Sequence, residues 1–411
     1  MIKIFKPCDF HVHLREGELA KQVLNENSKH FQKILIMPNL QVPITNINLL
    51  NKYRNHLLNN KKNLEILFTI YLNQNCSIKE LSEMKKKKLF FSVKLYPQNA
   101  TTNSSSGVSD IKKMTKYFEF LEKNDVPLCI HGEHVHFNDD PFEREKRFLD
   151  LELTWIRKNF PNLKITLEHI TTKDSVDFVK QHRLIGATVT THHLLENTYT
   201  FFGNHLKPEL FCKPIIKNVK HQQALQRVVL SGHKKFFFGS DSAPHLKSKK
   251  FTEFCCAGVY STKYSISNII EFFYRNKKQA NLDKFLTLNG NMHYDLDYFP
   301  KKITFKRFHK YKFKRFSKFK NDYLINYDYY TTHTDLSAHG DEIALPDRFA
   351  PLIVDRCKYY TYMLRSDPDH ANLANRDYQR KLSLLKTDYA SRADYMRDTR
   401  ISSGNSRLAI V

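Results

Sequence analysis

The sequence predicts an α/β fold, a (β/α)8 TIM barrel in which eight parallel strands alternate with helices, followed by a C-terminal extension. Three observations carry this prediction. Short apolar segments recur along the first 300 of the 411 residues, amphipathic segments separate most of them, and polar side chains stand where the apolar segments end. Strands that are apolar on both faces are typical of buried parallel sheets, and such a barrel takes roughly 250 residues.

Eight segments have the length and the β-branched or aromatic content of strands. They are residues 1–14, 34–38, 64–72, 90–97, 127–133, 164–170, 186–194 and 235–241. Polar segments with helical spacing lie between most of them, for example 108–124 and 173–182. This alternation favours a closed parallel sheet.

Composition excludes several classes of protein. Hydrophobic residues make up 41% of the chain, enough for a core, yet no apolar stretch approaches the roughly 20 residues of a membrane helix. The N-terminus MIKIFKPCDF lacks the apolar core of a secretory signal. Seven cysteines without CxxC spacing argue against a disulfide framework. We therefore expect a cytoplasmic protein without a membrane segment.

Basic residues change in kind along the chain. Residues 1–300 hold 36 Lys and 8 Arg, whereas 341–411 hold 3 Lys and 9 Arg. Between them, residues 301–320 hold ten Lys or Arg and no acidic residue. We predict a barrel domain over 1–300, a basic, aromatic-rich linker over 301–340, and a C-terminal extension over 341–411. A helical run is expected at 369–397.

The net charge of +24 raises the question of nucleic acid. Within 301–320, cations alternate with aromatic side chains, a pattern that binds single strands by stacking and charge. A coding bias, or a drifted end of the chain, accounts for the same composition, and we favour that explanation. If nucleic acid binds, we expect it only through this segment.

The polar residues at the strand ends are of metal-binding type. In a parallel barrel the C-terminal ends of all strands share one mouth, where catalytic groups collect. Two histidines one residue apart on a strand point to the same face. Imidazole and carboxylate ligands suit zinc, with manganese or cobalt as alternatives. The candidate ligands are His11, His13, Lys94, His131, His169 and Asp241.

Each candidate ligand also has an ordinary structural explanation. The histidine pair at 11–13 could lie on the surface, and His131 and His169 could be core histidines with satisfied hydrogen bonds. Asp241 could cap a helix. The occurrence of all of them at strand ends favours one shared site over separate coincidences.

Lys94 is unusual because it lies inside the apolar segment FFSVKLYP. A buried lysine is costly unless it is paired or chemically changed. Reaction with carbon dioxide gives a carbamate, which carries a carboxylate-like group able to bridge two cations. We therefore predict a carbamylated Lys94.

Six motifs point to a known family. They are DFHVHLR (9–15), MPN (37–39), KLYPQNATTNSSSGV (94–108), IHGE (130–133), EHITTKD (168–174) and GSDSAPH (239–245). From residue 1 to about 296 the chain resembles dihydroorotases of the single-chain bacterial type, in the amidohydrolase superfamily. The HxH element alone would indicate only the superfamily, whereas the KLYP motif is nearly diagnostic.

The resemblance implies an activity. Dihydroorotases reversibly hydrolyse the cyclic amide of dihydroorotate to N-carbamoyl-aspartate in pyrimidine synthesis. It implies two Zn²⁺ per chain, bridged by carbamylated Lys94, and a homodimer. Asp241 would take a proton from the attacking water and deliver it to the leaving amide nitrogen. The implied ligands are His11, His13 and Asp241 for the first ion, and His131 and His169 for the second.

The resemblance also implies contacts to the substrate. Arg15, Asn39 and His245 match the positions that contact the substrate carboxylate in the family. Arg15 offers a planar fork suited to that group. Each also has a simpler explanation: Arg15 could be a surface charge, Asn39 a turn residue and His245 an exposed loop residue.

A polar loop, ATTNSSSG at 100–107, would close over the substrate, with Thr101 and Thr102 as hydrogen-bond donors. Such a run is otherwise just a flexible loop. Backbone groups near Lys213 and at Ala257 and Gly258 would complete the pocket.

Some positions depart from the family. Thr191 stands where proline is common, Lys213 where an apolar residue is common, and Ser240 where threonine is usual. None of these removes a ligand. The chain also continues well past the usual family end, and residues 345–368 loosely resemble small structural proteins of tailed phages.

Two other functions stay open on the sequence. One is another cyclic amidase of the hydantoinase or allantoinase type, which the substrate-carboxylate set disfavours. The other is a non-catalytic barrel fused to a nucleic-acid-binding or virion-associated tail. Barrels that have lost activity typically lose metal ligands, and this chain keeps all six.

Overall fold

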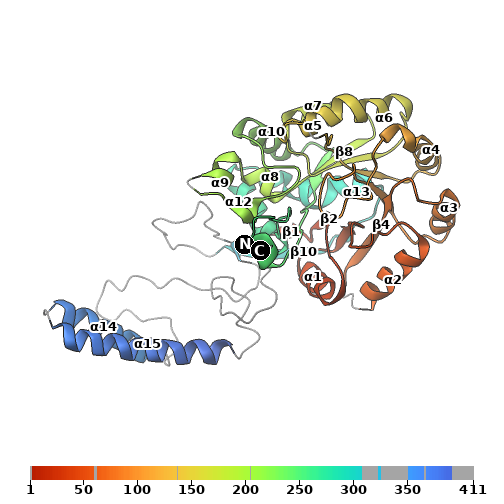
Figure 1. Cartoon of the computed structure of the whole chain (residues 1–411). Coiled ribbons are helices and arrows are strands. Elements are labelled where there is room, and N and C mark those ends of the chain that lie inside the picture. The colour runs from red at the N-terminus through yellow and green to blue at the C-terminus, as the bar shows by residue number, and fades with distance from the viewer. Residues whose placement is uncertain are drawn as a thin grey trace. The chain divides into compact units, whose positions relative to one another are not determined.

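The computed structural model describes residues 2–59, 63–136, 138–203, 205–307, 323–324, 350–364 and 367–390. These residues fall into two compact units, a large α/β unit and a pair of helices nearer the C-terminus. Each unit is described by itself, and Figure 1 labels their elements.

Eight parallel strands form the central sheet of the large unit, and their order in the sheet is their order in the chain. They are β2 (Cys8–Val12), β3 (Lys33–Ile36), β4 (Glu65–Leu72), β5 (Ser92–Leu95), β6 (Leu128–His131), β7 (Ile165–Glu168), β8 (Ile185–Val189) and β9 (Phe236–Phe238). A parallel bridge from Val12 to Ser242 brings the chain after β9 back beside β2. The predicted barrel is thereby confirmed.

Helices surround this sheet in Figure 1. They are α1 (Gly17–His30), α2 (Ile47–Leu58), α3 (Ile78–Lys86), α4 (Thr115–Lys123), α5 (Arg144–Phe148), α6 (Thr154–Asn159), α7 (Lys173–Gln181), α8 (Thr191–Leu195), α9 (Thr198–Phe202), α10 (Val219–Leu230), α11 (Lys247–Lys250), α12 (Thr262–Arg275) and α13 (Asn289–His293). Several begin with a side chain that accepts from a free helical N–H, as Asn46 does for α2 and Thr172 for α7. The predicted helices at 108–124 and 173–182 correspond to α4 and α7.

The prediction of one strand over 1–14 was wrong, because the segment forms two strands of different sheets. β1 (Ile2–Phe5) pairs antiparallel with β10 (Lys302–Arg307), which pairs with β11 (Tyr323–Leu324). Pro7 lies between β1 and β2 and has no N–H to continue a ladder. Similarly, the end of the predicted strand 186–194 is helical, because the Thr190 side chain caps α8.

Residues 302–305 therefore pair with residues 2–5, although we predicted a linker from residue 301. Most of the basic segment and of the predicted linker lies outside the described residues. The boundaries near 300 and 340 and any nucleic-acid contact stay predictions.

The second unit consists of α14 (Ala350–Leu364) and α15 (Pro368–Ala390), which pack against each other. An ion pair of 2.5 Å joins Asp355 to Lys381, and the Arg356 guanidinium lies over the rings of Tyr359 and Tyr378. Helix α15 covers most of the predicted run 369–397, whose last residues lie outside the described part. Among the residues described, no helix is long and apolar enough to cross a membrane.

We expect the β1–β10 pairing to stabilise the large unit. Phe305 of β10 is buried in the same cluster as Ile2 and Ile4 of β1. Truncating this ring should therefore lower the free energy of unfolding by about 3 kcal/mol in Phe305→Ala, measured by chemical denaturation. The exposed neighbour Thr304 supplies the control Thr304→Ala. An unchanged midpoint for Phe305→Ala would mean that β10 is dispensable and that the barrel domain ends near residue 300.

Candidate active site

Three of the predicted metal ligands meet where the barrel closes. His11 lies in β2, His13 follows that strand, and Asp241 follows β9. The Nε2 atoms of the two histidines lie 3.3 Å apart. Oδ1 of Asp241 lies 3.2 Å from His11 Nε2 and 3.0 Å from His13 Nε2. All three side chains are buried, so one small region holds two nitrogens and one carboxylate oxygen.

The other predicted ligands lie on the adjoining strands. His131 ends β6 and His169 directly follows β7, and Nδ1 of His131 lies 3.2 Å from Nε2 of His169. Lys94 is fully buried within β5. The rings of His11 and His169 are 5.0 Å apart between centroids, which joins this group to the first. The structure thus brings all six predicted residues together at the C-terminal ends of the strands.

Glu168 links the two groups and was missed in the sequence. One carboxylate oxygen contacts the Lys94 ammonium, and the other lies 2.9 Å from Nδ1 of His11. A carboxylate beside the outer nitrogen of a histidine fixes the ring, so that its other nitrogen faces the metal. An acidic residue next to His169 in an apolar strand was the available signal.

Backbone conformation at the site is sparsely populated for residues other than glycine. Arg15, His169 and Asp241 have φ angles of 64, 43 and 44°. Specific hydrogen bonds hold two of them, because the His169 N–H donates to Thr188 Oγ1 at 2.7 Å and the Asp241 N–H to the His11 carbonyl at 2.9 Å. Such strain costs about 1–3 kcal/mol per residue and is found mostly at functional sites.

Burial sets the protonation of the cluster. It lowers the pKa of His13 to about 4 and that of His169 well below its usual value, so both are neutral at pH 7 and offer a lone pair. Burial also lowers the pKa of Lys94 to about 7. Burial acts to raise the pKa of Asp241, but the interactions with His11 and His13 outweigh it and keep this carboxyl ionised.

These residues fit divalent cations. Neutral imidazole nitrogens and a carboxylate oxygen are the ligands that zinc prefers, and here they lie within 3.3 Å of one another. A lysine with a pKa of about 7 is partly neutral at physiological pH, and the neutral amine is the form that reacts with carbon dioxide.

A small cavity adjoins this cluster, and most predicted substrate residues line it. The lining residues are His13, Arg15, Asn39, Thr101, Thr102, Lys213, Asp241, Ala243, Ala257 and Gly258. His245 supports the wall, because its Nε2 lies 3.0 Å from Arg15 Nη2 and 2.9 Å from the Ala257 carbonyl. Gly258 has a φ of 145°, and a Cβ there would lie 2.7 Å from His245 Nε2, so only glycine fits.

The polar loop 100–107 closes this cavity. Asn39 donates to the Thr102 carbonyl at 3.1 Å, the Thr102 hydroxyl donates to the Ala257 carbonyl at 3.2 Å, and Asn103 donates to the Asn39 carbonyl at 3.1 Å. The cavity volume of about 20 Å³ has room for about one water molecule, far less than the roughly 300–1,000 Å³ of an ordinary ligand pocket. The loop must therefore open to admit a ligand.

Lys250, at the end of α11, organises the opposite wall and was not found in the sequence. Its buried ammonium donates to the carbonyls of Phe211, Cys256 and Gly258 at 2.7, 3.0 and 2.7 Å. It thereby joins the segment before Lys213 to the segment that holds Gly258. The run KSKK at 247–250 gave no signal that one of its lysines would be buried.

Two further acidic residues position the ligands. Oδ1 of Asp9 accepts the backbone N–H of His11 at 3.1 Å and that of Ser240 at 2.8 Å. Glu145 accepts from the backbone and hydroxyl groups of Thr171 and Thr172, directly after His169. Asp9 lies within a quoted motif, whereas Glu145 lies in a polar helix without any distinguishing pattern.

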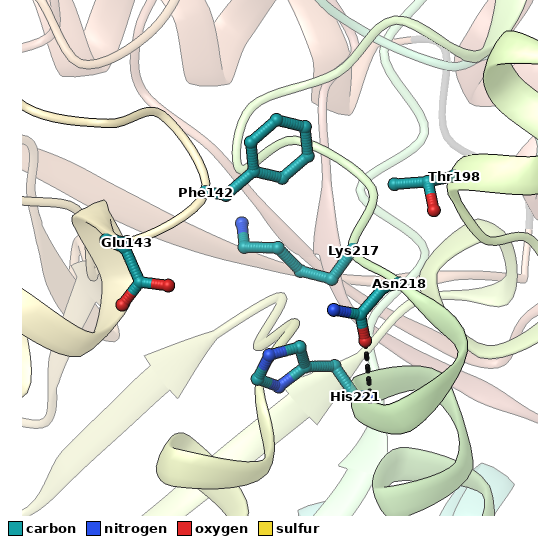
Figure 2. A pocket seen from close by; sticks show the side chains of 6 residues that line it. All are labelled: Phe142, Glu143, Thr198, Lys217, Asn218 and His221. Atoms are coloured by element: carbon teal, nitrogen blue, oxygen red, sulfur yellow. Dashed lines mark hydrogen bonds between the residues drawn. The ribbon is translucent and has the colours of Figure 1, made fainter.

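A larger cavity of about 220 Å³ lies near the start of α10 (Figure 2). Its lining residues are Phe142, Glu143, Thr198, Lys217, Asn218 and His221. None of the predicted ligands or substrate residues lines it, so size alone would direct attention to the wrong place.

Comparison with known proteins agrees with this geometry. The model of the amidohydrolase family matches residues 6–297. A dihydroorotase of Buchnera aphidicola is 40% identical over 308 residues, which cover 74% of this chain and 88% of the relative. The chain belongs to the dihydroorotases of the amidohydrolase family. The match to the family model ends at residue 297, before β10. Residues 345–368 lie outside that match, so their likeness to phage proteins stays a prediction.

Solved dihydroorotases share the fold. The enzyme from Campylobacter jejuni has a TM-score of 0.68 at 35% identity and covers 75% of this chain and 90% of its own. The dihydroorotase of Saccharomyces cerevisiae, solved with 5-fluoroorotic acid, has a TM-score of 0.68 at 33% identity and covers 72% and 85%.

The departures from the dihydroorotase pattern are structurally mild. Thr191 is the first residue of α8, the position where proline is favoured for its fixed φ, and the helix forms without it. The Ser240 hydroxyl accepts from the Ser242 N–H at 3.0 Å and lies 3.2 Å from the His11 carbonyl, as a threonine hydroxyl could.

We expect Lys250→Met to destabilise the pocket. The variant keeps the length of the side chain but leaves three carbonyls without their donor, which should cost about 3 kcal/mol of unfolding free energy in chemical denaturation. Lys249→Met, at the exposed neighbour, should change it by less than about 0.5 kcal/mol. Equal stability of the two variants would remove Lys250 from this role.

Proposed function

We propose that this chain catalyses the reversible hydrolysis of dihydroorotate to N-carbamoyl-aspartate in pyrimidine synthesis. One observation carries the proposal. Two residues of the metal-binding cluster, His13 and Asp241, line one small cavity together with Arg15, which suits a carboxylate, in a chain that belongs to the dihydroorotases. The substrate presents both a cyclic amide and a carboxylate.

The proposal includes two Zn²⁺ per chain. His11, His13 and Asp241 would hold one and His131 and His169 the other, with carbamylated Lys94 between them. When bound, the ions polarise the ring carbonyl and make water more acidic. Glu168 would keep His11 oriented through its Nδ1.

Asp241 is the proposed general base and acid. Among the residues described, it is the one that contributes a carboxylate both to the metal cluster and to the wall of the cavity. Because its pKa is held low, the carboxylate is ionised and can accept a proton from the attacking water. The protonated group then delivers that proton to the amide nitrogen as the ring opens.

Arg15, Asn39 and His245 are the proposed recognition site for the substrate carboxylate. The Nε of Arg15 donates to the Pro244 carbonyl at 3.1 Å, which fixes the guanidinium while its other nitrogens face the cavity and His245. Burial lowers the pKa of His245 to about 3, so the imidazole is neutral and does not add to the charge. Thr101, Thr102 and the backbone at Lys213, Ala257 and Gly258 would bind the ring.

The carboxylate distinguishes this proposal from its rival. A hydantoinase or allantoinase acts on rings without that group, and Arg15 would then have no carboxylate to bind in the cavity. A homodimer in the cytoplasm completes the proposal, and sedimentation of the purified chain tests the dimer.

The deciding experiment measures metal content and turnover on residues 1–411. We expect about two zinc ions per chain, with loss of absorbance as dihydroorotate is hydrolysed. Asp241→Asn should lower kcat by about 10²–10⁴-fold, whereas Asp150→Asn, at an exposed aspartate, should not. Two metals without turnover would point to another cyclic amide. An active Asp241→Asn would remove Asp241 as the base.

Carbamylation of Lys94 predicts a dependence on pH and bicarbonate. Because burial lowers the pKa of this lysine to about 7, the reactive neutral amine dominates above pH 7 and is lost as the pH falls below it. Metal-stripped protein should regain metal faster at pH 8 than at pH 6, and only with bicarbonate, as measured by elemental analysis. Lys94→Ala should show no bicarbonate effect. Full uptake without bicarbonate would contradict the carbamate.

Arg15→Met tests the recognition of the carboxylate. Losing one charged hydrogen-bonding partner should raise KM for dihydroorotate by about 10–100-fold, with a smaller effect on kcat. Activity on dihydrouracil, which lacks the carboxylate, should be weak in the native enzyme and unchanged by the substitution. Arg183→Met, at an exposed arginine, is the control. A native preference for dihydrouracil would favour the hydantoinase type.

A further inference from the structure

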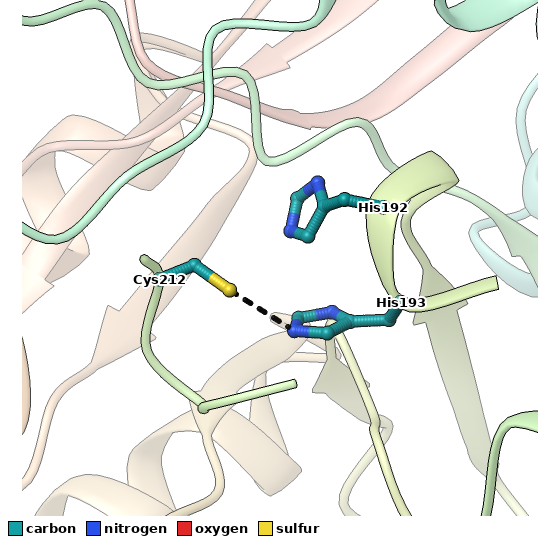
Figure 3. A group of neighbouring side chains, drawn as sticks. All are labelled: His192, His193 and Cys212. Atoms are coloured by element: carbon teal, nitrogen blue, oxygen red, sulfur yellow. Dashed lines mark hydrogen bonds between the residues drawn. The ribbon is translucent and has the colours of Figure 1, made fainter. Parts of the chain in front are cut away.

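A second cluster of metal-binding side chains lies outside the site described above. His192 and His193 belong to α8, and Cys212 precedes the pocket residue Lys213. One donor atom from each of the three lies within 4.8 Å of the others. Figure 3 shows the two rings and the thiol turned toward a common point. All three side chains are buried, with 4% of His192 exposed.

His192 is the member of the cluster that points to a ligand. Neither of its ring nitrogens has a hydrogen-bond partner among the residues described. A buried polar group without a partner costs about 1–3 kcal/mol, so such groups are rare in folded proteins. The ring nitrogens of His192 are therefore available to coordinate a cation beside the thiol and the second imidazole.

The distance between Cys212 and His193 suits two ligands of one tetrahedral ion. Sγ of Cys212 lies 3.4 Å from Nε2 of His193. Bonds of about 2.0 Å to nitrogen and about 2.3 Å to sulfur, at a tetrahedral angle, place such atoms about 3.5 Å apart. The Pro214 carbonyl oxygen lies 3.3 Å from this sulfur and 2.9 Å from this nitrogen.

We propose that His192, His193 and Cys212 form a third metal site, which takes Zn²⁺. Thiolate together with imidazole selects a borderline-soft ion over magnesium or calcium. Binding releases the thiol proton of Cys212 to solvent, and His193 exchanges its contact with the Pro214 carbonyl for the ion.

The site would have a structural role. It would join α8, which follows the barrel strand β8, to the segment 212–214. Because Lys213 in that segment lines the substrate cavity, the ion would fix one wall of the pocket. The proposal itself needs only the cluster and does not depend on the reaction catalysed.

Without an ion, His193 already has partners. Its Nδ1 lies 2.9 Å from the Thr190 hydroxyl and its Nε2 contacts the Pro214 carbonyl. A histidine with a purely structural role would make the same contacts as His193. It would not be left without hydrogen-bond partners, as His192 is. The two explanations differ in whether the sulfur of Cys212 binds a cation.

Cobalt gives a direct readout of that sulfur. The full chain is stripped of metal and refilled with Co²⁺, and its near-ultraviolet absorption is recorded with the bound cobalt. A thiolate bound to Co²⁺ gives a charge-transfer band, which the sulfur-free cluster around Asp241 cannot produce. We expect the band in the native chain and its loss in Cys212→Ser, with bound cobalt falling by about one ion per chain.

Two further variants make the test decisive. His192→Gln keeps a polar side chain of similar size and should weaken Co²⁺ binding at this site at least tenfold, which decides the question if Cys212→Ser does not fold. The double variant Cys255→Ser, Cys256→Ser should keep the band, because those thiols lie outside the cluster. A native chain without the band, or a band that survives in Cys212→Ser, overturns the third site. Turnover of dihydroorotate, measured on the same samples, reports separately on the proposed function.

Discussion

The closure of the barrel between its first and last strands is the constraint on which the site depends. The Asp241 N–H binds the His11 carbonyl, the His13 N–H binds the Ser242 carbonyl at 3.0 Å, and Asp9 joins the two segments from inside. These bonds bring His13 beside Asp241, which lies 228 positions further along the chain. The same contacts that complete the sheet therefore assemble the metal cluster.

Burial gives this cluster its chemistry. The surrounding strands exclude water, so the histidines stay neutral and the lysine loses much of its basicity, while Asp241 keeps its charge through its neighbours. Such an arrangement is costly to fold, because buried polar atoms and left-handed backbone both raise the free energy of the native state. The hydrogen bonds that Asp9 and Glu145 accept, and those that Lys250 donates, offset part of this cost.

Sequence patterns predict the parts of this structure that follow from local rules. Short apolar strands and the polar residues at their ends were sufficient for the barrel and for the place of the six ligands proposed at its mouth, because parallel strands share one rim. The division of residues 1–14 into two strands depends on a partner some 300 residues away, which no local pattern encodes. Burial of Lys250 depends on the backbone carbonyls of Phe211, Cys256 and Gly258, which only the fold brings to it. Burial of Glu145 likewise depends on Thr171 and Thr172, and its own polar helix gives no sign of it. The closed state of the loop at 100–107 is likewise set by contacts that only the fold creates.

The pairing of β1 with β10 has a consequence for synthesis of the chain. Strand β10 is synthesised about 300 residues after β1, which takes roughly 15–60 s at ordinary elongation rates. During that interval Ile2 and Ile4 form an unpaired apolar edge, the kind that recruits other nascent chains. The exposed Lys3 between them and Lys6 after them place positive charge along that edge, and like charges on neighbouring chains repel. Charge of this kind on an edge strand disfavours its pairing with another chain.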